Sequence, residues 1–184
     1  MSVRVALIVG SLREGSYSRH IAQAIKELAQ PALDLVPVEF GDLPLYNPDL
    51  DTDAPPAAWT RFRKEVAATQ AVLFVTPEYN RSIPGGLKNA LDVGSRPYGH
   101  SVWQAKPAAI VSVSPGAVSG FGANHHLRQP LVFLNMPTLQ QPEAYIGNVA
   151  ALLDEHGKLT NPGTRDFLKT FADAFAAWIE KTKA

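Results

Sequence analysis

The sequence predicts an α/β fold in which a doubly wound parallel sheet of five strands carries helices on both faces. Two observations lead to this prediction. Apolar runs at 3–10, 71–77 and 107–114 lack polar alternation, which is typical of strands that are buried on both faces. Segments with apolar residues at helical spacing follow these runs, and an alternation of strands and helices favours a parallel sheet.

The same two patterns place the elements along the chain. Strands are expected at residues 3–10, 33–40, 71–77, 107–114 and 138–141. Helices are expected at about residues 16–30, 57–69, 84–93, 123–136 and 162–181. Pro37 has no backbone N–H to donate, which places the second strand near a sheet edge. Pro130 must kink the fourth helix or mark its start. Trp59 and Trp103 are expected to have ordinary packing roles.

Composition limits both the number of domains and the class of function. The 184 residues are 46% hydrophobic, which suits one domain over residues 1–184 with a sizeable core. Lys and Arg number 17, as do Asp and Glu, and without a basic stripe we expect no nucleic-acid partner. The absence of cysteine excludes disulfides, thiolate catalysis and cysteine-ligated metals. No apolar run approaches the roughly 18 residues of a membrane span, so we expect a cytoplasmic protein without membrane contact.

Three loops that follow predicted strands are candidates for a shared binding site. They cover residues 10–19, 77–84 and 114–122 and are rich in Gly, Ser and Pro. In doubly wound sheets, ligands bind outside the carboxyl ends of the strands. These three loops should therefore lie together at one edge of the sheet.

The first loop, GSLREGSYSR, has the features of an anion site. A glycine-rich turn that enters a helix offers backbone N–H groups, and Arg13 adds a cation beside three serine hydroxyl groups. The simpler interpretation is a helix-capping serine with an exposed arginine. A P-loop is excluded because Ser16 and Tyr17 replace its lysine and hydroxyl residue, and Leu12 replaces the second glycine of the dinucleotide fingerprint. What remains suits the single phosphate of a mononucleotide.

The second and third loops leave room for a flat ligand. The second presents Glu78, Tyr79 and Asn80 in a row, and its ordinary interpretation is a turn in which Ser82 caps the next helix. The third loop, SPGAVSGFG, consists mostly of small residues. We expect no carboxylate, histidine or metal cluster to face the other two loops. The ligand itself would then bring the reactive chemistry.

The two motifs GSLREGSYS and TPEYNRSIPGGLKNALD resemble the NADPH-dependent FMN reductase family, and most closely its quinone and chromate reductases. The similarity extends to HHLRQPLVFLNMPTLQQPE and so covers most of the chain. The resemblance implies a flavodoxin-like sheet in the order 2-1-3-4-5. It also implies that bound FMN is reduced by NADPH or NADH and passes electrons to quinones, chromate or similar small acceptors, with ping-pong kinetics. No residue is expected to act as a catalytic acid or base.

The resemblance also implies which residues hold the cofactor. The phosphate should be held by Ser11, Arg13, Ser16, Tyr17 and Ser18. One side of the isoalloxazine ring should be lined by Pro77, Glu78, Tyr79, Asn80 and Ser82, and the other by Ser114, Gly116 and Gly120. The chain departs from the family at Ser18, where asparagine is common, and at Ser119-Gly120, where a Gly-Gly pair is common.

Other functions are less well supported by the sequence. His125 and His126 are adjacent, so they cannot both point to one ligand beside a helix, and no third metal ligand lies near them in sequence. The segments around Ser114 and Ser119 lack the first glycine of the nucleophile elbow of hydrolases. A flavodoxin-type electron carrier remains the main alternative, although flavodoxins are usually strongly acidic.

The fourth predicted helix suggests an oligomer. Its apolar stripe is wider than one core face needs and contains Leu127, Leu131, Val132, Phe133 and Leu134. Deep burial within one chain is the simpler interpretation. Relatives that resemble the chain are dimers or tetramers, so we expect a homodimer or homotetramer in which residues of a second subunit border the flavin. Arg128 and Glu143 could pair across such an interface, pair within one chain or face solvent.

Overall fold

A parallel sheet of five strands forms the centre of the protein in a computed structural model that describes residues 2–182. The order β2-β1-β3-β4-β5 is the order that the family resemblance implies. Val5 in the inner strand β1 pairs with Leu35 of β2 on one side and with Ala71 of β3 on the other. The strands are β1 (Val3–Val9), β2 (Leu33–Pro37), β3 (Ala71–Thr76), β4 (Ala108–Val113) and β5 (Ala144–Ile146).

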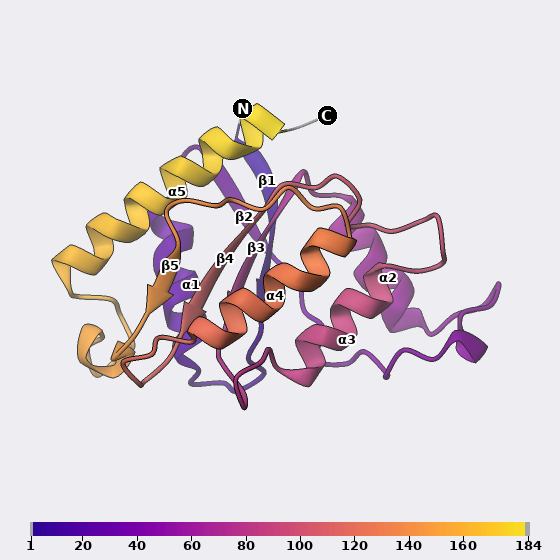
Figure 1. Cartoon of the computed structure of the whole chain (residues 1–184), viewed down its shortest axis with the longest axis horizontal. Coiled ribbons are helices and arrows are strands. Elements are labelled where there is room, and N and C mark those ends of the chain that lie inside the picture. Colours follow the sequence, from indigo (N-terminus) through magenta and orange to yellow (C-terminus); the bar gives the residue numbers. More distant parts are fainter. Residues whose placement is uncertain (1, 183–184) are drawn as a thin grey trace.

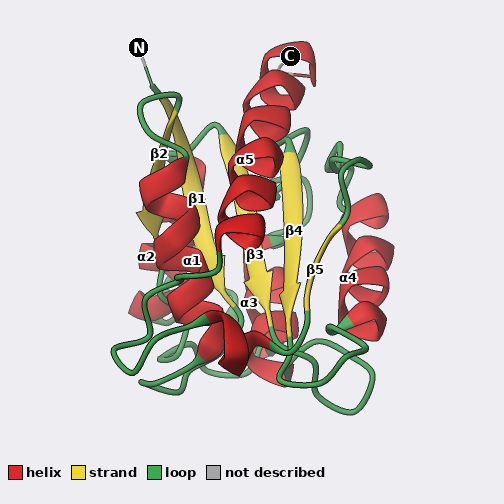
Figure 2. Ribbon diagram, turned by 90° about the vertical axis from the view of Figure 1, so that its left-hand side faces the viewer, coloured by secondary structure: helices red, strands yellow, loops and turns green. Residues whose placement is uncertain are grey.

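Helices cover both faces of this sheet, as Figures 1 and 2 show. Helices α1 (Tyr17–Leu28) and α5 (Pro162–Thr182) share one hydrophobic core with the sheet. Helices α2 (Ala57–Ala67), α3 (Gly85–Gly94) and α4 (Phe121–Phe133) form a second core on the opposite face. Within residues 2–182, no helix combines the length and the apolar character that crossing a membrane requires.

Burial explains why three of the strands were readable from the sequence. Every residue of β3 and β4 is buried, because each strand is covered on both faces. Pro37 ends β2, which is an edge strand as predicted. Trp59 and Trp103 are both fully buried in the second core, which confirms their expected packing role.

The predicted fifth strand at 138–141 is wrong. Thr138 makes only an isolated bridge to Ala108 at the start of β4, and the ladder resumes at Ala144–Ile146. Between these points lies Pro142, which has no N–H to donate to a ladder. The fourth helix also begins at Phe121 rather than 123, and Pro130 lies inside it near its end.

Candidate functional site

The three predicted loops meet at the carboxyl edge of the sheet, where Figure 2 shows them gathered beyond the arrowheads of the strands. The Gly10 N–H donates to the carbonyl of Val75 at 2.8 Å, which joins the ends of β1 and β3. A Cβ atom on Gly10 would lie 2.9 Å from Thr76 Oγ1, so only glycine allows this approach. The Ser114 N–H donates to Ile146 at 2.9 Å and brings the third loop to the end of β5.

The first loop leads into α1 and forms a cradle for an anion. Ser16 caps the helix, and its Oγ accepts the N–H of Arg19 at 3.1 Å. Ser11 Oγ accepts the N–H of Arg13 at 3.4 Å. Because Ser11 and Ser16 both act as acceptors in these bonds, the hydroxyl hydrogens of both remain available to a ligand. The Arg13 side chain is exposed, and no carboxylate within residues 2–182 forms an ion pair with it. This cradle fits one phosphate group, because the helix N-terminus and Arg13 both favour a negative charge.

The remaining residues predicted for the phosphate lie in the first turn of α1. Ser18 is buried, and Tyr17 is half-buried and packs against the core between α1 and α5. Of the predicted phosphate residues, Ser11, Arg13 and Ser16 therefore form the open part of the cradle.

The second loop begins with a two-residue hairpin turn. Tyr79 and Ser82 exchange both backbone hydrogen bonds, at 2.9 and 3.0 Å. Between them, Asn80 has φ 51° and Arg81 has φ 65°, which is the left-handed pair that a type I′ turn requires. Asparagine tolerates this conformation well, whereas arginine rarely adopts it. The turn leaves Tyr79 and Asn80 exposed at the mouth of the site.

Two side-chain contacts fix this turn against α4. Glu78 accepts the N–H of Ala123 at 3.0 Å with one carboxylate oxygen and the guanidinium of Arg81 at 3.1 Å with the other. Ser82 Oγ lies 2.6 Å from Nδ1 of His126. The expectation that Ser82 caps the next helix is therefore wrong, and α3 begins after Pro84 without a side-chain cap.

His126 is a site residue that the sequence reasoning missed. We expected no histidine to face the loops, but α4 carries His126 against Ser82, which lies 44 positions earlier in the chain. His125 points elsewhere and lies 3.0 Å from the hydroxyl of Tyr145 through Nε2. The two adjacent histidines thus have separate partners, as their spacing predicted. Burial, together with a hydrogen bond to Glu143, raises the pKa of Tyr145 to about 12.

The third loop has a backbone conformation that explains the family preference for glycine. Ser119 has φ 61° and Gly120 has φ 72°. Ser119 is held there because its carbonyl accepts the hydroxyl of Ser112 at 2.9 Å. Ser114 Oγ accepts the N–H of Gly116 at 3.1 Å, which shapes the start of the loop.

We predict that Gly120→Ala lowers the free energy of unfolding by about 1–2 kcal/mol, the penalty for a side chain in the left-handed region. Its Cβ would also lie 3.0 Å from Ser112 Cβ. Gly116→Ala is the matched control, because the nearest atom to its Cβ is 3.7 Å away and its φ is not positive. Urea unfolding measures both variants. If the two variants lose the same free energy of unfolding, the left-handed conformation of residue 120 is not the cause of the loss.

A cleft of about 320 Å³ opens between the first two loops. Arg13 and Tyr79 contribute side chains to its lining, and Gly85 and Gly86 line it without side chains. Phe40 forms another wall, and a Cβ on Gly86 would lie 3.3 Å from its ring. The lining is Gly10, Leu12, Arg13, Phe40, Tyr79, Pro84, Gly85 and Gly86. Three glycines and two aromatic rings beside one cation fit a planar group that carries a phosphate.

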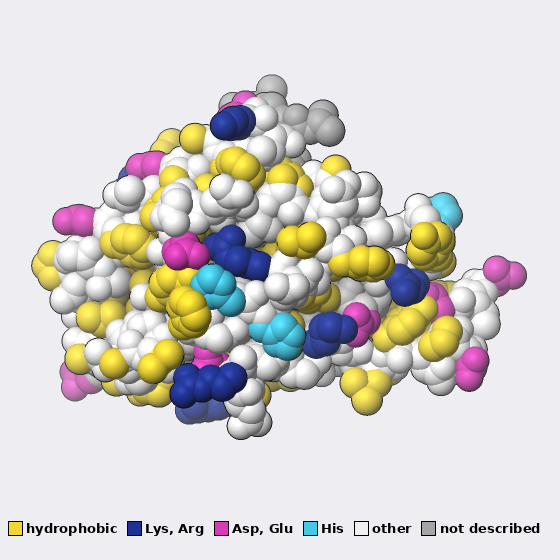
Figure 3. Space-filling view, viewed as in Figure 1, with side chains coloured by type: hydrophobic (Ala, Val, Ile, Leu, Met, Phe, Trp, Pro, Cys, Tyr) yellow, Lys and Arg dark blue, Asp and Glu magenta, His cyan; other side chains and the backbone are white. Residues whose placement is uncertain are grey.

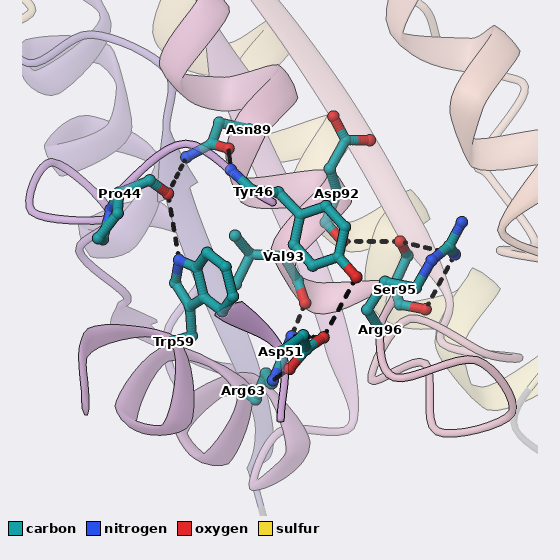
Figure 4. Close-up of polar contacts among 10 residues, drawn as sticks. All are labelled: Pro44, Tyr46, Asp51, Trp59, Arg63, Asn89, Asp92, Val93, Ser95 and Arg96. Atoms are coloured by element: carbon teal, nitrogen blue, oxygen red, sulfur yellow. Dashed lines mark hydrogen bonds and ion pairs between the residues drawn. The ribbon is translucent and has the colours of Figure 1, made fainter. Parts of the chain in front are cut away.

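The loop after β2, residues 41–56, is held beside this cleft by the polar network in Figure 4. Arg63 of α2 donates two hydrogen bonds to Asp51 at 2.9 and 2.8 Å, and a third to Val93 at 2.9 Å. The side chains of Arg63 and Asp51 are only 13% and 4% exposed. Asn89 of α3 accepts the N–H of Tyr46 at 2.8 Å. Burial and the neighbouring Asp51 carboxylate raise the pKa of Tyr46.

Comparison with known proteins agrees with this geometry. Residues 3–151 match the model of the NADPH-dependent FMN reductase family. A quinone reductase from Pseudomonas putida is 62% identical over 180 residues, which cover 98% of this chain and 96% of the relative. A 2-hydroxy-1,4-benzoquinone reductase from Burkholderia sp. is 43% identical over 179 residues, covering 97% of each chain.

A solved structure is also similar along its whole length. FerB, a flavoenzyme NAD(P)H:(acceptor) oxidoreductase from Paracoccus denitrificans, superposes with a TM-score of 0.93 at 40% identity. The match covers 99% of this chain and 100% of FerB. At this TM-score and coverage, the two chains share one fold.

Proposed function

The chain belongs to the NADPH-dependent FMN reductase family, and from this premise we propose that it oxidises NAD(P)H and passes the electrons through bound FMN to quinones. The single observation that carries the proposal is the loop cluster, in which a cradle for one phosphate adjoins a cleft whose lining combines three glycines with two aromatic side chains. Chromate and similar small acceptors are proposed as further substrates, because an open ring face discriminates weakly. We propose that residues 1–184 act as one FMN-binding domain, and a cytoplasmic location stays a prediction.

The proposed cofactor contacts follow the three loops. FMN, when bound, supplies the hydride and electron chemistry, and the protein supplies binding and orientation. Ser11, Arg13 and Ser16 would neutralise the phosphate, with Tyr17 and Ser18 behind them in the first turn of α1. The ring would lie against two groups of residues: Pro77, Glu78, Tyr79, Asn80 and Ser82 on one side, and Ser114, Gly116 and Gly120 on the other. Positioning the nicotinamide on the ring replaces a bimolecular encounter, which contributes up to about 7–11 kcal/mol in ideal cases.

Steady-state kinetics test this proposal against a flavodoxin-type electron carrier. The FMN-loaded protein should consume NADPH in the presence of benzoquinone, and double-reciprocal plots at several quinone concentrations should be parallel, as ping-pong kinetics require. NADH in place of NADPH measures the nicotinamide preference. An electron carrier would hold FMN but consume no NADPH on its own, and that result would contradict the proposed enzyme.

We further propose that the protein is a homodimer or homotetramer through α4. Leu127, Leu131 and Leu134 of the predicted apolar stripe are buried within the chain, whereas Val132 and Phe133 are 79% and 80% exposed. Figure 3 shows the face that α4 presents, where apolar side chains lie among charged groups and histidines. Exposed apolar neighbours of this size are typical of an interface. Arg128 already bonds Asn124 and Leu139 within the chain, so it needs no partner subunit.

Sedimentation at micromolar concentration measures this assembly. The wild-type protein should sediment as a dimer or a larger species, and the double variant Val132→Asp, Phe133→Ser should sediment as a monomer. Leu45→Ser is the control, because Leu45 is also 78% exposed but lies on the loop after β2. A wild-type monomer that is fully active and loaded with flavin would show that each site is complete in one chain.

A further inference from the structure

Ser82 and His126 form a hydroxyl–imidazole pair beside the proposed flavin site. Ser82 closes the hairpin turn after β3, and His126 lies in the second turn of α4. Their Oγ and Nδ1 atoms are 2.6 Å apart, which is a short hydrogen bond. Ser82 is half-buried and His126 is exposed, so water reaches the imidazole.

The surrounding contacts fix the positions of Ser82 and His126 relative to each other. The backbone bonds between Tyr79 and Ser82 fix the turn, and Glu78 fastens it to the N–H of Ala123 on α4. The turn that carries Ser82 and the helix α4 that carries His126 are therefore also joined by the bond from Ala123 to Glu78. The hydrogen bond needs no rearrangement to form.

Among the described hydroxyl groups of the three loops that have a hydrogen-bond partner, Ser82 is the one that bonds an imidazole, a group that can both accept and donate a proton. The hydroxyl groups of Ser11, Ser16 and Ser114 all accept backbone N–H groups instead. The other charged side chains on the turn, α3 and α4 have partners of their own: Arg81 has Glu78, Lys88 has Asp92, and Arg128 has Asn124 and Leu139.

The proposed reaction needs a proton that NAD(P)H does not supply. Reduction of a quinone to a quinol adds two electrons and two hydrogens, and the hydride of NAD(P)H accounts for both electrons and one hydrogen. The second hydrogen must arrive as a proton from water. We propose, on the basis of the proposed function, that Ser82 and His126 relay this proton to the oxygen of the reduced acceptor.

In the relay, each bond to hydrogen that breaks is matched by one that forms. When the imidazole is protonated, its Nδ1–H donates to Ser82 Oγ, and the hydroxyl hydrogen of Ser82 is free to point at the acceptor. The Ser82 O–H bond breaks as an O–H bond forms on the acceptor, while the proton on Nδ1 passes to Ser82 Oγ. Nε2 keeps its hydrogen throughout, and a proton from bulk water then returns to Nδ1, which restores the imidazolium of His126. Ser82 touches the acceptor, and His126 acts through Ser82.

The variant His126→Asn distinguishes proton transfer through His126 from a purely structural role of its hydrogen bond to Ser82. The asparagine amide occupies the position of Nδ1 and keeps a hydrogen bond to Ser82, but it has no proton that titrates near neutral pH. FMN affinity and the rate of reduction by NADPH should stay at wild-type values. Oxidation of the reduced protein by benzoquinone should slow by about 100-fold, the lower range for loss of a general acid. Oxidation by ferricyanide, which takes up electrons but no proton, should not change.

His125→Asn is the matched control and should change none of these values, because His125 bonds Tyr145 instead. An NMR titration gives a readout that is independent of turnover: Ser82→Ala should shift the titration of His126 and leave that of His125 in place. The relay is overturned if His126→Asn reacts with benzoquinone at the wild-type rate, slows with both acceptors equally, or loses FMN affinity. A wild-type protein that holds FMN but is not reduced by NADPH would contradict the proposed function, and the NMR titration would still test the pair.

Discussion

Asp51→Ala should lower the free energy of unfolding by about 3–5 kcal/mol, the range for removing one partner of a buried ion pair. Asp51 is 4% exposed and accepts two hydrogen bonds from Arg63, so its loss leaves a guanidinium with little solvent and with only its bond to the carbonyl of Val93. The hydroxyl of Tyr46 also donates to Asp51, at 3.3 Å, and would lose its acceptor. Urea unfolding followed by circular dichroism measures the change.

Asp173→Ala is the control for this prediction. Asp173 pairs with Lys169 one turn away on α5, but the two side chains are 57% and 48% exposed. Exposed pairs of this kind contribute about 0.3–0.5 kcal/mol, so the control should unfold almost as the wild type does. If Asp51→Ala costs no more than Asp173→Ala, the pair does not hold the loop after β2 in place.

Arg13→Ala should weaken FMN binding by about 1.5–3 kcal/mol, the range for hydrogen bonds to charged groups. The Arg13 side chain is exposed beside the N-terminus of α1, where an anion already meets a favourable dipole. Riboflavin lacks the phosphate, so its affinity should be nearly unchanged. Fluorescence titration of the flavin-free protein with FMN and with riboflavin gives both affinities.

Arg81→Ala provides the comparison, since it removes an exposed cation near the same cleft without touching the first loop. This variant should leave the ratio of FMN to riboflavin affinity close to the wild-type ratio. Equal losses of both ligands in Arg13→Ala would mean that Arg13 supports the fold and does not bind the phosphate.

The central strands could be predicted because burial on both faces leaves a clear apolar pattern. This holds for β1, β3 and β4, and the loops that follow them were located by the same reasoning. The fifth strand was misplaced because it has only three residues and follows a segment with its own buried leucine, Leu139. The position of such a short strand is set by its pairing with β4, and a local sequence pattern does not reveal that pairing.

The contacts that complete the site join residues far apart in the sequence. Ser82 meets His126 across 44 positions, and Glu78 meets Ala123 across 45. Each is an ordinary residue in its own segment, and Ser82 had a simpler local interpretation as a helix cap. Only the packing of α4 beside the turn after β3 brings these groups together. The sequence therefore located the three loops but not the side chains that hold them against α4.

Identification of the flavin released from the purified protein tests most directly whether the three loops form an FMN site. The protein should be yellow as purified, or become yellow with added FMN, and denaturation should release FMN in a one-to-one ratio to the chain. This expectation rests on a cradle for one phosphate and on a first loop without the dinucleotide fingerprint. Release of FAD, or a protein that stays colourless with added FMN, would contradict the account.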